Sequence, residues 1–357
     1  MWHLAQRGAQ ILGLDRFEPP HDRGSSHGQT RIIRQAYFEH PDYTPLLLES
    51  YRLWEELAWH TRRQLYHEVG LLQVGPAEGE VVPGVLRAAQ EHRLRVDELT
   101  ATEIQHRWPG LRVPEELIGV FERQAGYLLV EECVRAHVEA ARQAGAELRC
   151  SVEVLGWEIG ETIQVRTNVG EFSTDRLIVA AGAWAGSLLG DLRVPLEVRR
   201  KSLFWYEANG EHYSATNDFP TFFFELPNGM FYGFPQLDGR GVKLAEHTGG
   251  KPVADPLELD RSLHRDEQER IESFLQQHFL HVTSRNTDHA ACMYTMSPDE
   301  HFVVDRHPEC SSVVFAAGLS GHGFKFTSVL GKALADLSLK GKTNLPIDFL
   351  SLNRFVN

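Results

Sequence analysis

The residues best suited to chemistry lie near the end of the chain. Cys292 stands in the string A-C-M-Y-T and is followed by P-D-E at 298–300. Further on, Lys325 closes a loop at 318–325 of sequence G-L-S-G-H-G-F-K. The cysteine supplies a nucleophile and the lysine a cation, while the three glycines let backbone N–H groups approach a ligand closely. The pattern therefore predicts a ligand site at this loop.

The elements expected around this loop fit such a site. The apolar run at 313–317, V-V-F-A-A, predicts a buried strand directly before the loop, and a helix is expected to begin near Phe326. Because the N-terminus of a helix carries partial positive charge, a loop in this place favours anionic or electron-rich groups.

Two more groups of polar residues occur earlier in the chain. Residues 24–34 read G-S-S-H-G-Q-T-R-I-I-R and contain Arg31 and Arg34, with His27 nearby. A planar guanidinium binds a carboxylate through two hydrogen bonds, which lysine cannot copy. Lys243 and His247 occur in K-L-A-E-H, and alternation along a strand would place both on one face. Taken singly, all of these are typical of surface residues, so their roles depend on the other motifs.

The start of the chain predicts half of a dinucleotide-binding unit. Residues 2–7 are expected to be the last turns of a helix, Gly8 its C-cap, and residues 10–15 a strand that ends at Asp15. An acid in this place accepts hydrogen bonds from an adenosine ribose. The first strand and its G-x-G-x-x-G loop, about 20 residues before that acid, would precede Met1. We expect a start assigned too late or a trimmed form, rather than a protein that works without that strand.

Composition narrows the class of protein. A chain of 357 residues predicts two domains or one large α/β unit. With 36 basic against 49 acidic residues, the net charge of −13 argues against nucleic acid and anionic membranes as partners. No apolar run approaches the ~20 residues of a membrane span, and no signal peptide is visible. The four cysteines lack metal-site spacing and fit reduced thiols, so we expect a cytoplasmic protein without a metal.

Hydrophobic patterns predict the remaining elements. Helices are expected at 43–62, 80–94 and 131–143, and strands at 69–75, 147–154, 163–167 and 177–181, the last followed by Gly182 and Trp184. Three aromatic-rich runs, at 202–206, 221–224 and 230–234, are typical of an antiparallel sheet.

Taken in this order, the motifs resemble those of the monomeric sarcosine oxidase family, which includes N-methyltryptophan oxidase. The resemblance runs from residue 2 to about 353 and includes Y-G-F-P at 232–235 and C-M-Y-T-x-x-P-D-E at 292–300. It implies an α/β fold (α+β overall), with an FAD-binding Rossmann-like domain and an interleaved antiparallel-sheet substrate domain. The first domain would comprise 1–64, 130–196 and 288–357 and be N-terminally incomplete, and the second 65–129 and 197–287.

The resemblance also implies catalytic roles. Cys292 would link FAD covalently through a thioether to the flavin 8-methyl carbon, although a lone cysteine is usually a small buried hydrophobe. Arg31 would lie against one face of the flavin, with His27 nearby. Lys243 would lie near flavin N5, where a cation would stabilise the charge that develops as oxygen is activated.

In the same resemblance, the substrate carboxylate would be held between Arg34 and Lys325. Tyr294 would lie close to the substrate nitrogen, and Tyr232 and His247 would line the pocket. Two cations on one carboxylate would explain selectivity for free amino acids over simple amines.

Further contacts to FAD follow from the resemblance alone. Val154 falls where the family has a valine that contacts the adenine, although a valine in a strand is more often a core residue. The A-A-G-A-W string at 180–184 resembles the end of an FAD-binding strand of the family, but by itself it is weak evidence for FAD binding. The cofactor-binding residues implied are Asp15, Ser25, Thr30, Arg31, Val154, Gly182, Trp184, Cys292, Met293, Gly321, His322, Gly323, Phe324 and Lys325.

The implied activity is FAD-dependent oxidative demethylation of an N-methyl amino acid by oxygen, by a protein expected to be a monomer. Sarcosine is the first choice, because 292–295 and 299–302 look more like the sarcosine oxidases than the tryptophan-derivative branch. Its products would be glycine, formaldehyde and hydrogen peroxide. Three alternatives stay open: oxidation of N-methyltryptophan, pipecolate or another secondary amino acid, a dehydrogenase that reduces a carrier protein, and an inactive, truncated, flavin-free protein.

Overall fold

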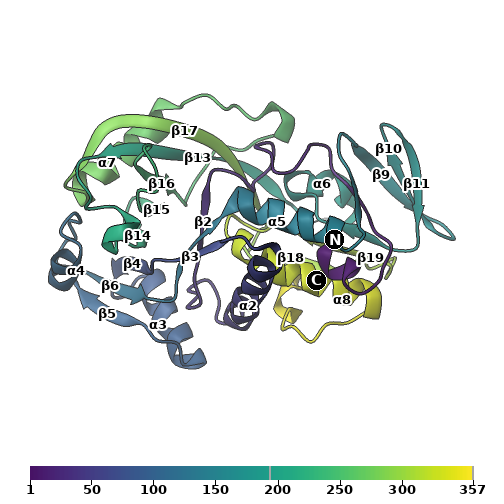
Figure 1. Ribbon diagram of the computed structural model, residues 1–357, viewed down its shortest axis with the longest axis horizontal. Coiled ribbons are helices and arrows are strands. Elements are labelled where there is room, and N and C mark those ends of the chain that lie inside the picture. Colours follow the sequence, from purple (N-terminus) through teal and green to yellow (C-terminus); the bar gives the residue numbers. More distant parts are fainter. Residues whose placement is uncertain (193, 356–357) are drawn as a thin grey trace.

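The structure is a computed structural model that describes residues 1–192 and 194–355. Two regions lie side by side along the longest dimension of the molecule (Figure 1). One is built on a large sheet, and the other on short parallel strands and long helices. The predicted fold class is confirmed.

The large sheet has eight strands in the order β17-β13-β16-β15-β14-β4-β6-β5. Neighbouring strands are antiparallel except β14 and β4, which are parallel, so the sheet is mixed where the sequence predicted an antiparallel one. The strands are β4 (Leu71–Pro76), β5 (Asp97–Thr100), β6 (Leu117–Glu122), β13 (Glu197–Ala208), β14 (Thr221–Leu226), β15 (Gly229–Phe234), β16 (Val242–Glu246) and β17 (Val282–Met296).

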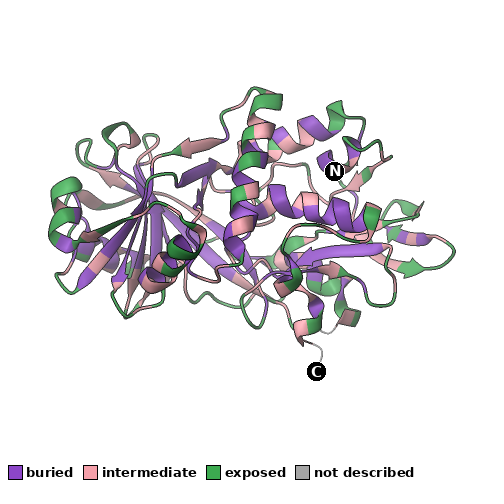
Figure 2. Cartoon of the chain, turned by 90° about the horizontal axis from the view of Figure 1, so that it is seen from below, coloured by how far each residue is buried: buried purple, intermediate pink, exposed green. Residues whose placement is uncertain are grey.

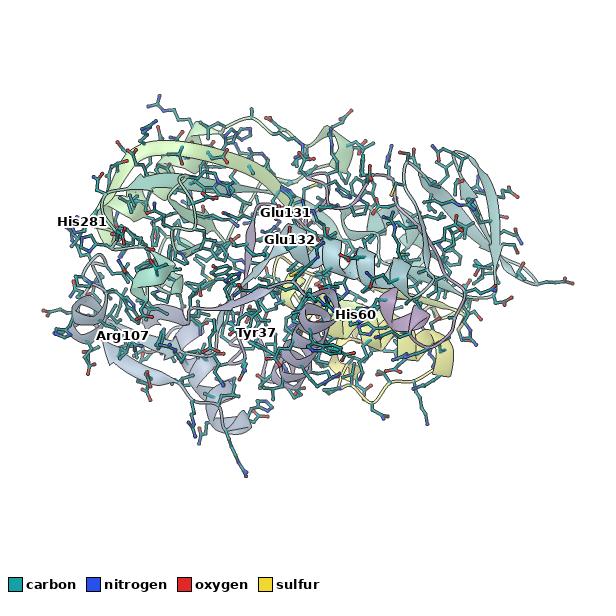
Figure 3. All side chains as sticks on the ribbon, in the orientation of Figure 1. Tyr37, His60, Arg107, Glu131, Glu132 and His281 are labelled. Atoms are coloured by element: carbon teal, nitrogen blue, oxygen red, sulfur yellow. The ribbon has the colours of Figure 1, made fainter. Side chains whose placement is uncertain are left out.

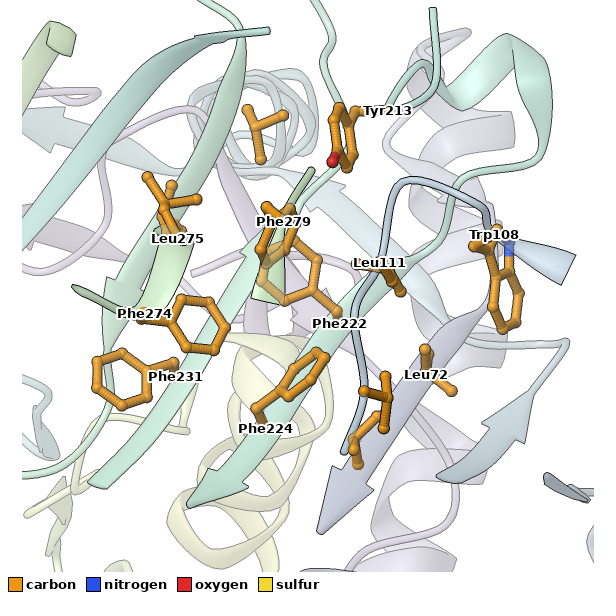
Figure 4. Close-up of a cluster of buried hydrophobic side chains, with 14 of the residues drawn as sticks. Leu72, Trp108, Leu111, Tyr213, Phe222, Phe224, Phe231, Phe274, Leu275 and Phe279 are labelled. Carbon is orange, nitrogen blue, oxygen red and sulfur yellow. The ribbon is translucent and has the colours of Figure 1, made fainter. Parts of the chain in front are cut away.

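This sheet has two buried faces, because alternate residues of a strand point to opposite sides. In β14, Phe222 belongs to one hydrophobic cluster and Phe223 to another. The first cluster packs the sheet against α7 (Arg265–His278), where the rings of Phe274 and Phe231 stack with centroids 4.6 Å apart (Figure 4). The second face carries the candidate site.

Smaller elements cover this second face. β2 (Thr30–Ile33), β7 (Gly126–Leu129) and β3 (Tyr66–Glu68) form an antiparallel sheet in the order β2-β7-β3. α3 (Val81–His92) packs on β4 and β6 on this face, whereas α4 (Ala101–Arg107) packs on β5 and β6 on the face of the first cluster.

The second region contains the parallel strands. β1 (Leu12–Leu14) pairs with β8 (Glu147–Arg149), and β12 (Leu177–Val179) pairs with β19 (Val313–Ala317), both in parallel. β18 (Val303–Arg306) lies antiparallel to β19. β9 (Val154–Ile159), β10 (Ile163–Thr167) and β11 (Gly170–Thr174) form a separate antiparallel sheet.

Helices pack beside these strands and turn their buried residues inward (Figure 2). α2 (Tyr43–Thr61) contacts both α5 (Val130–Gln143) and α8 (Thr327–Lys340). The short helices are α1 (Trp2–Ala5) and α6 (Ala185–Leu188). Among the described helices, none is both long and apolar enough to cross a bilayer.

Two predicted strands were wrong in extent. The strand expected at 147–154 is two strands, β8 and β9, because the chain turns between them at Ser151, where φ is +60°. The strand expected at 10–15 is limited to β1, so Asp15 follows it directly. The predicted domain boundaries stay predictions, and β17 crosses the one at residue 288.

Candidate active site

Four of the predicted catalytic and pocket residues share one face of the large sheet. Cys292 and Tyr294 lie on β17, Lys243 on β16 and Tyr232 on β15. Residues directly opposed in neighbouring strands point to the same side, and the strand register places these four on the face away from α7. Residues far apart in sequence thus meet on one surface.

The segment at 24–34 crosses this surface, where it turns sharply. Gly28 and Gln29 have φ values of +86° and +74°, and a Cβ at Gly28 would lie 2.4 Å from the Leu203 side chain. The Glu131 carboxylate accepts the backbone N–H groups of Gly28 and Gln29 at 2.8 and 3.2 Å. Glu131 lies in the first turn of α5, beside Glu132 (Figure 3). A helix start therefore fixes the loop that leads into β2.

The Cys292 thiol contacts a cation. Arg31 points its guanidinium at the sulfur, with Nη2 3.4 Å from Sγ and 2.8 Å from the Ser25 carbonyl. Ser25 in turn donates its hydroxyl hydrogen to the Met293 carbonyl at 2.7 Å. Burial alone would raise the pKa of the thiol, but Arg31 and His27 outweigh it and lower the pKa to about 6. Cys292 is therefore a thiolate at neutral pH, the nucleophilic form of cysteine.

Arg34 is held between aromatic rings and paired with an acid. Its guanidinium carbon lies 4.4 Å from the ring centroid of Tyr37 and 4.6 Å from that of Phe38. Nη2 donates to both carboxylate oxygens of Glu39, at 2.6 and 2.7 Å. Within the described residues, the buried Nε has no hydrogen-bond partner. The guanidinium thus retains donor capacity for a second anion.

A chain of hydrogen bonds through His322 and Tyr37 holds the Lys325 ammonium in place. Its Nζ donates to the His322 carbonyl at 2.8 Å and to the Tyr37 hydroxyl at 3.3 Å. His322 Nε2 lies 3.0 Å from the Glu300 carbonyl and must donate there, so Nδ1 accepts from the Tyr37 hydroxyl at 2.6 Å. Burial and, to a smaller extent, the nearby Arg34 lower the pKa of Lys325 to about 7.

His247 lies among aromatic side chains just beyond the end of β16. Its ring centroid is 5.7 Å from those of Phe223 and Tyr294 and 6.2 Å from that of Tyr232. Nδ1 is 3.5 Å from the Tyr294 hydroxyl, which is 3.4 Å from the Tyr232 hydroxyl. Burial lowers the pKa of His247 to about 3, so the imidazole is neutral at physiological pH.

Lys243 is the most buried of the predicted cations, at 1% exposure. Its Nζ donates to the carbonyls of Gly28 and Thr30 and to the Thr30 hydroxyl, at 2.5, 2.9 and 3.0 Å. An ammonium has three N–H donors, so all are used. Any small molecule that hydrogen-bonds to this ammonium must replace one of these partners.

Most of the predicted pocket residues line one cavity of about 50 Å³. Its walls include residues that the sequence did not single out, namely Ile32, Glu39 and Phe223. The predicted residues that line it are Arg31, Arg34, Tyr232, His247, Tyr294, Gly321, His322, Phe324 and Lys325. His27, Lys243 and Cys292 lie outside this cavity.

The remaining predicted residues fit an FAD beside this cavity. Asp15, Gly182 and the loop at 318–323 follow the carboxyl ends of β1, β12 and β19, the edge where parallel α/β sheets bind ligands. Trp184 packs in one cluster with Met293, and its buried Nε1 has no hydrogen-bond partner in the described chain.

Two glycines also fit a cofactor that lies close to the backbone. Gly182 has φ of +55°, and nothing lies within 4 Å of the place that a Cβ would occupy. Thr30 and Ser25 bond to Lys243 and Met293, as given above, whereas Val154 packs in a cluster beside β1. Gly323 could not carry a Cβ without meeting the Leu319 side chain.

Sequence reasoning missed three acids that support the site. Glu39 pairs with Arg34, Glu131 holds the loop before β2, and Glu122 accepts the N–H groups of Gln35 and Ala36 at 2.7 and 3.0 Å. Burial raises the pKa of Glu122 to about 7. Glu39 follows Arg34 closely and could have been suspected, but nothing local marks the other two, which approach from distant elements.

A family model for FAD dependent oxidoreductases matches residues 1–337. The chain belongs to this family. It is 41% identical to a monomeric sarcosine oxidase from Bacillus sp. (strain B-0618), an alignment that covers 99% of this chain and 92% of that protein. It is 37% identical to an N-methyl-L-tryptophan oxidase from Citrobacter koseri (strain ATCC BAA-895 / CDC 4225-83 / SGSC4696), over 99% of this chain and 95% of that one.

A solved structure agrees with these relatives. NikD, an unusual amino acid oxidase essential for nikkomycin biosynthesis, superimposes with a TM-score of 0.84 at 25% identity, over 98% of this chain and 93% of that one. The predicted resemblance is thus confirmed, and the chain is a flavin-dependent amine oxidase.

The loop at 318–325 gives a first test of this geometry. Gly321 has φ of +80°, and an added Cβ would lie 2.3 Å from two ring atoms of Tyr294. We expect Gly321→Ala to lower the free energy of unfolding by ~2–5 kcal/mol, from a left-handed backbone and overpacking. Urea denaturation of both proteins measures this difference in the free energy of unfolding. The control is Gly186→Ala, where nothing lies within 4 Å and φ is not positive, and an equal loss in both variants would contradict the prediction.

Proposed function

We propose that this oxidase demethylates an N-methyl amino acid, with sarcosine as the preferred substrate. The observation that carries the proposal is a cavity lined by two buried cations, Arg34 and Lys325, next to neutral histidines and tyrosine hydroxyls. A substrate carboxylate would satisfy both cations. Sarcosine is preferred because residues 292–295 and 299–302 look more like the sarcosine oxidases, and because the identity to a monomeric sarcosine oxidase, 41%, exceeds that to an N-methyl-L-tryptophan oxidase, 37%.

FAD, when bound, would accept a hydride equivalent from the N-methyl carbon and pass the two electrons to oxygen. With water, the products are the primary amino acid, formaldehyde and hydrogen peroxide. Asp15, Ser25, Gly182 and Trp184 would hold the cofactor through its ribose, pyrophosphate and ring system. The loop at 318–325 would complete its cradle.

Arg34 must change partner for the substrate to bind. Its Nη2 is engaged with Glu39, which lines the same cavity. A substrate carboxylate carries the same charge and geometry as the Glu39 carboxylate, so it can replace that side chain. The Arg34 Nε, which has no partner among the described residues, supplies a further donor to it.

The site also favours the uncharged substrate amine. Arg34 and Lys325 disfavour a third positive charge nearby, and His247 and His322 are neutral because burial lowers the pKa of each. The amine therefore loses its proton more readily here than in water. Tyr294 offers a hydroxyl close to the expected position of the nitrogen, since it lines the cavity beside His247.

We place oxygen reduction near Lys243. A buried ammonium stabilises negative charge as oxygen accepts electrons. The presence of this lysine supports an oxidase over a dehydrogenase that passes electrons to a carrier protein.

The direct test is an assay of the purified holoenzyme with sarcosine. Formaldehyde and hydrogen peroxide should form in a one-to-one ratio, with slower turnover of N-methyltryptophan and pipecolate. Formaldehyde formed only with an added electron acceptor would favour the dehydrogenase alternative. No flavin in the purified protein would favour the flavin-free alternative.

Covalent attachment through Cys292 is the next prediction. Arg31 holds the thiolate, and exchanging one C–H bond of the flavin 8-methyl carbon for a C–S bond would release two electrons and one proton. Oxygen would take these up, together with one proton from water, as hydrogen peroxide. Acid-precipitated protein should retain yellow, fluorescent flavin, whereas Cys292→Ser should release it. Cys310→Ser is the matched control and should retain flavin. Flavin released equally from all three proteins would exclude the linkage.

Replacing Arg34 tests carboxylate recognition. Arg34→Lys keeps the charge but loses the planar, two-pronged contact, which should lower kcat/KM for sarcosine by ~10²–10³-fold, or about 3–4 kcal/mol. An N-methyl amine without a carboxylate should be oxidised poorly and almost equally by both proteins. A uniform loss for both substrates would show that Arg34 does not bind the carboxylate.

Affinity for a carboxylate inhibitor should depend on pH through Lys325. Burial, and then Arg34, lower the pKa of Lys325 to about 7 in the free protein, and a bound carboxylate favours the charged form. Binding therefore takes up a proton above pH 7, and Kd should rise by up to about tenfold per pH unit. Titrations of flavin absorbance from pH 6 to 9 measure this. In Lys325→Met the dependence should vanish, and its persistence would assign the titration to another group.

A further inference from the structure

Lys201 is a fourth deeply buried cation at this site, and none of the functions above uses it. It lies on β13 directly opposite Cys292 and is 4% exposed. Because opposed residues share a face, its side chain lies on the same side of the sheet as Cys292 and Tyr294. Nothing in the sequence marks this lysine, since a single lysine next to an apolar run is usually exposed to solvent.

The Lys201 ammonium binds the backbone where β16 ends. Nζ donates to the carbonyls of His247 and Thr248 at 2.7 and 2.6 Å. β16 ends at Glu246, so these carbonyls belong to the chain that leaves the sheet. The chain then turns tightly around the lysine, because a Cβ at Gly250 would lie 3.3 Å from Lys201 Cε. Lys201 thus supplies partners for two carbonyls that lie beyond the strand.

The same ammonium lies over the Tyr294 ring, 5.0 Å from its centroid. An aromatic face attracts a cation, so this contact restrains the ring. His247 and Tyr294 line the cavity and point their polar atoms toward each other, with Nδ1 and the hydroxyl 3.5 Å apart. Lys201 does not line the cavity. It contacts the backbone of one of these residues and the ring of the other.

Filling space does not by itself account for a charged residue here. Among the described residues, no carboxylate lies within ion-pair distance of Lys201, and burying an unpaired charge is costly. An apolar side chain of similar length would fill the space without that cost, but it could not bind the two carbonyls. The donors of Lys201 are therefore what the site requires.

We propose that Lys201 is a positioning residue, which holds His247 and Tyr294 against the reacting end of an N-methyl amino acid substrate. The inference rests on the proposed function. Arg34 and Lys325 would anchor the carboxylate, and Lys201 would hold the part of the wall that contacts the amine and its methyl group. Loss of Lys201 should then slow chemistry more than it weakens carboxylate binding.

The test compares Lys201→Met with the unaltered holoenzyme in anaerobic stopped-flow reduction by sarcosine, normalised to bound flavin. The limiting rate of flavin reduction should fall ~10–100-fold, as expected for a small misplacement of reacting groups. The Kd of a carboxylate inhibitor should change less than about threefold. Lys201→Arg, which keeps the donors, should recover most of the rate. Lys251→Met, at an exposed lysine, should match the unaltered enzyme.

A double-mutant cycle shows whether the effect passes through His247. Lys201→Met in a His247→Ala background should slow reduction much less than it does alone, because the residue it positions is absent. An unchanged rate per flavin in Lys201→Met, or equal losses in both backgrounds, would overturn the inference while leaving the proposed function intact. No flavin reduction by any N-methyl amino acid in the unaltered enzyme would overturn the proposed function and this inference with it.

If Lys201→Met does not fold, Lys201→Arg and Lys201→Gln carry the test. Gln keeps two N–H donors but lacks the charge. Reduction by Lys201→Gln at the unaltered rate would show that the hydrogen bonds suffice, and a rate as low as in His247→Ala would show that they do not position this wall.

Discussion

The structure depends on burying positive charge on one face of a sheet. Arg34, Lys201, Lys243 and Lys325 are each at most 5% exposed, and within the described residues only Arg34 pairs with a carboxylate. Buried charge is unfavourable unless it is hydrogen-bonded. The three lysines are satisfied mainly by backbone carbonyls. Most of these carbonyls, those of residues 28, 247, 248 and 322, lie outside the strands and helices.

The same constraint accounts for the selectivity of the site. Arg31, Arg34 and Lys325 line the cavity, so it favours anions and disfavours protonated amines. Glu39 neutralises Arg34 in the free protein and must yield its place to a substrate carboxylate. Neutral His247 and His322 add polarity without charge. A cavity lined by cations beside a thiolate suits the N-methyl amino acid substrate and the covalent flavin linkage that we propose.

Motifs within one stretch of chain predicted much of this arrangement. The C-M-Y-T string and the glycine loop led to Cys292, Tyr294 and Lys325, because each motif lies on one strand or one loop. The aromatic-rich runs at 202–206, 221–224 and 230–234 predicted three strands of the large sheet, namely β13, β14 and β15. Their pairing could not be read, and the parallel contact of β14 with β4 joins segments about 150 residues apart.

The sequence did not predict the hydrogen-bond partners that come from distant strands and helices. Glu122 and Glu131 look like ordinary strand and helix acids until the fold brings them to backbone N–H groups of residues 28–36. Lys201 looks like a solvated lysine until β13 pairs with β17. A crystal structure of the holoenzyme with a bound carboxylate inhibitor tests the central claim most directly. The account predicts the carboxylate between Arg34 and Lys325, with Glu39 displaced. A carboxylate bound elsewhere, with Arg34 still paired to Glu39, would contradict it.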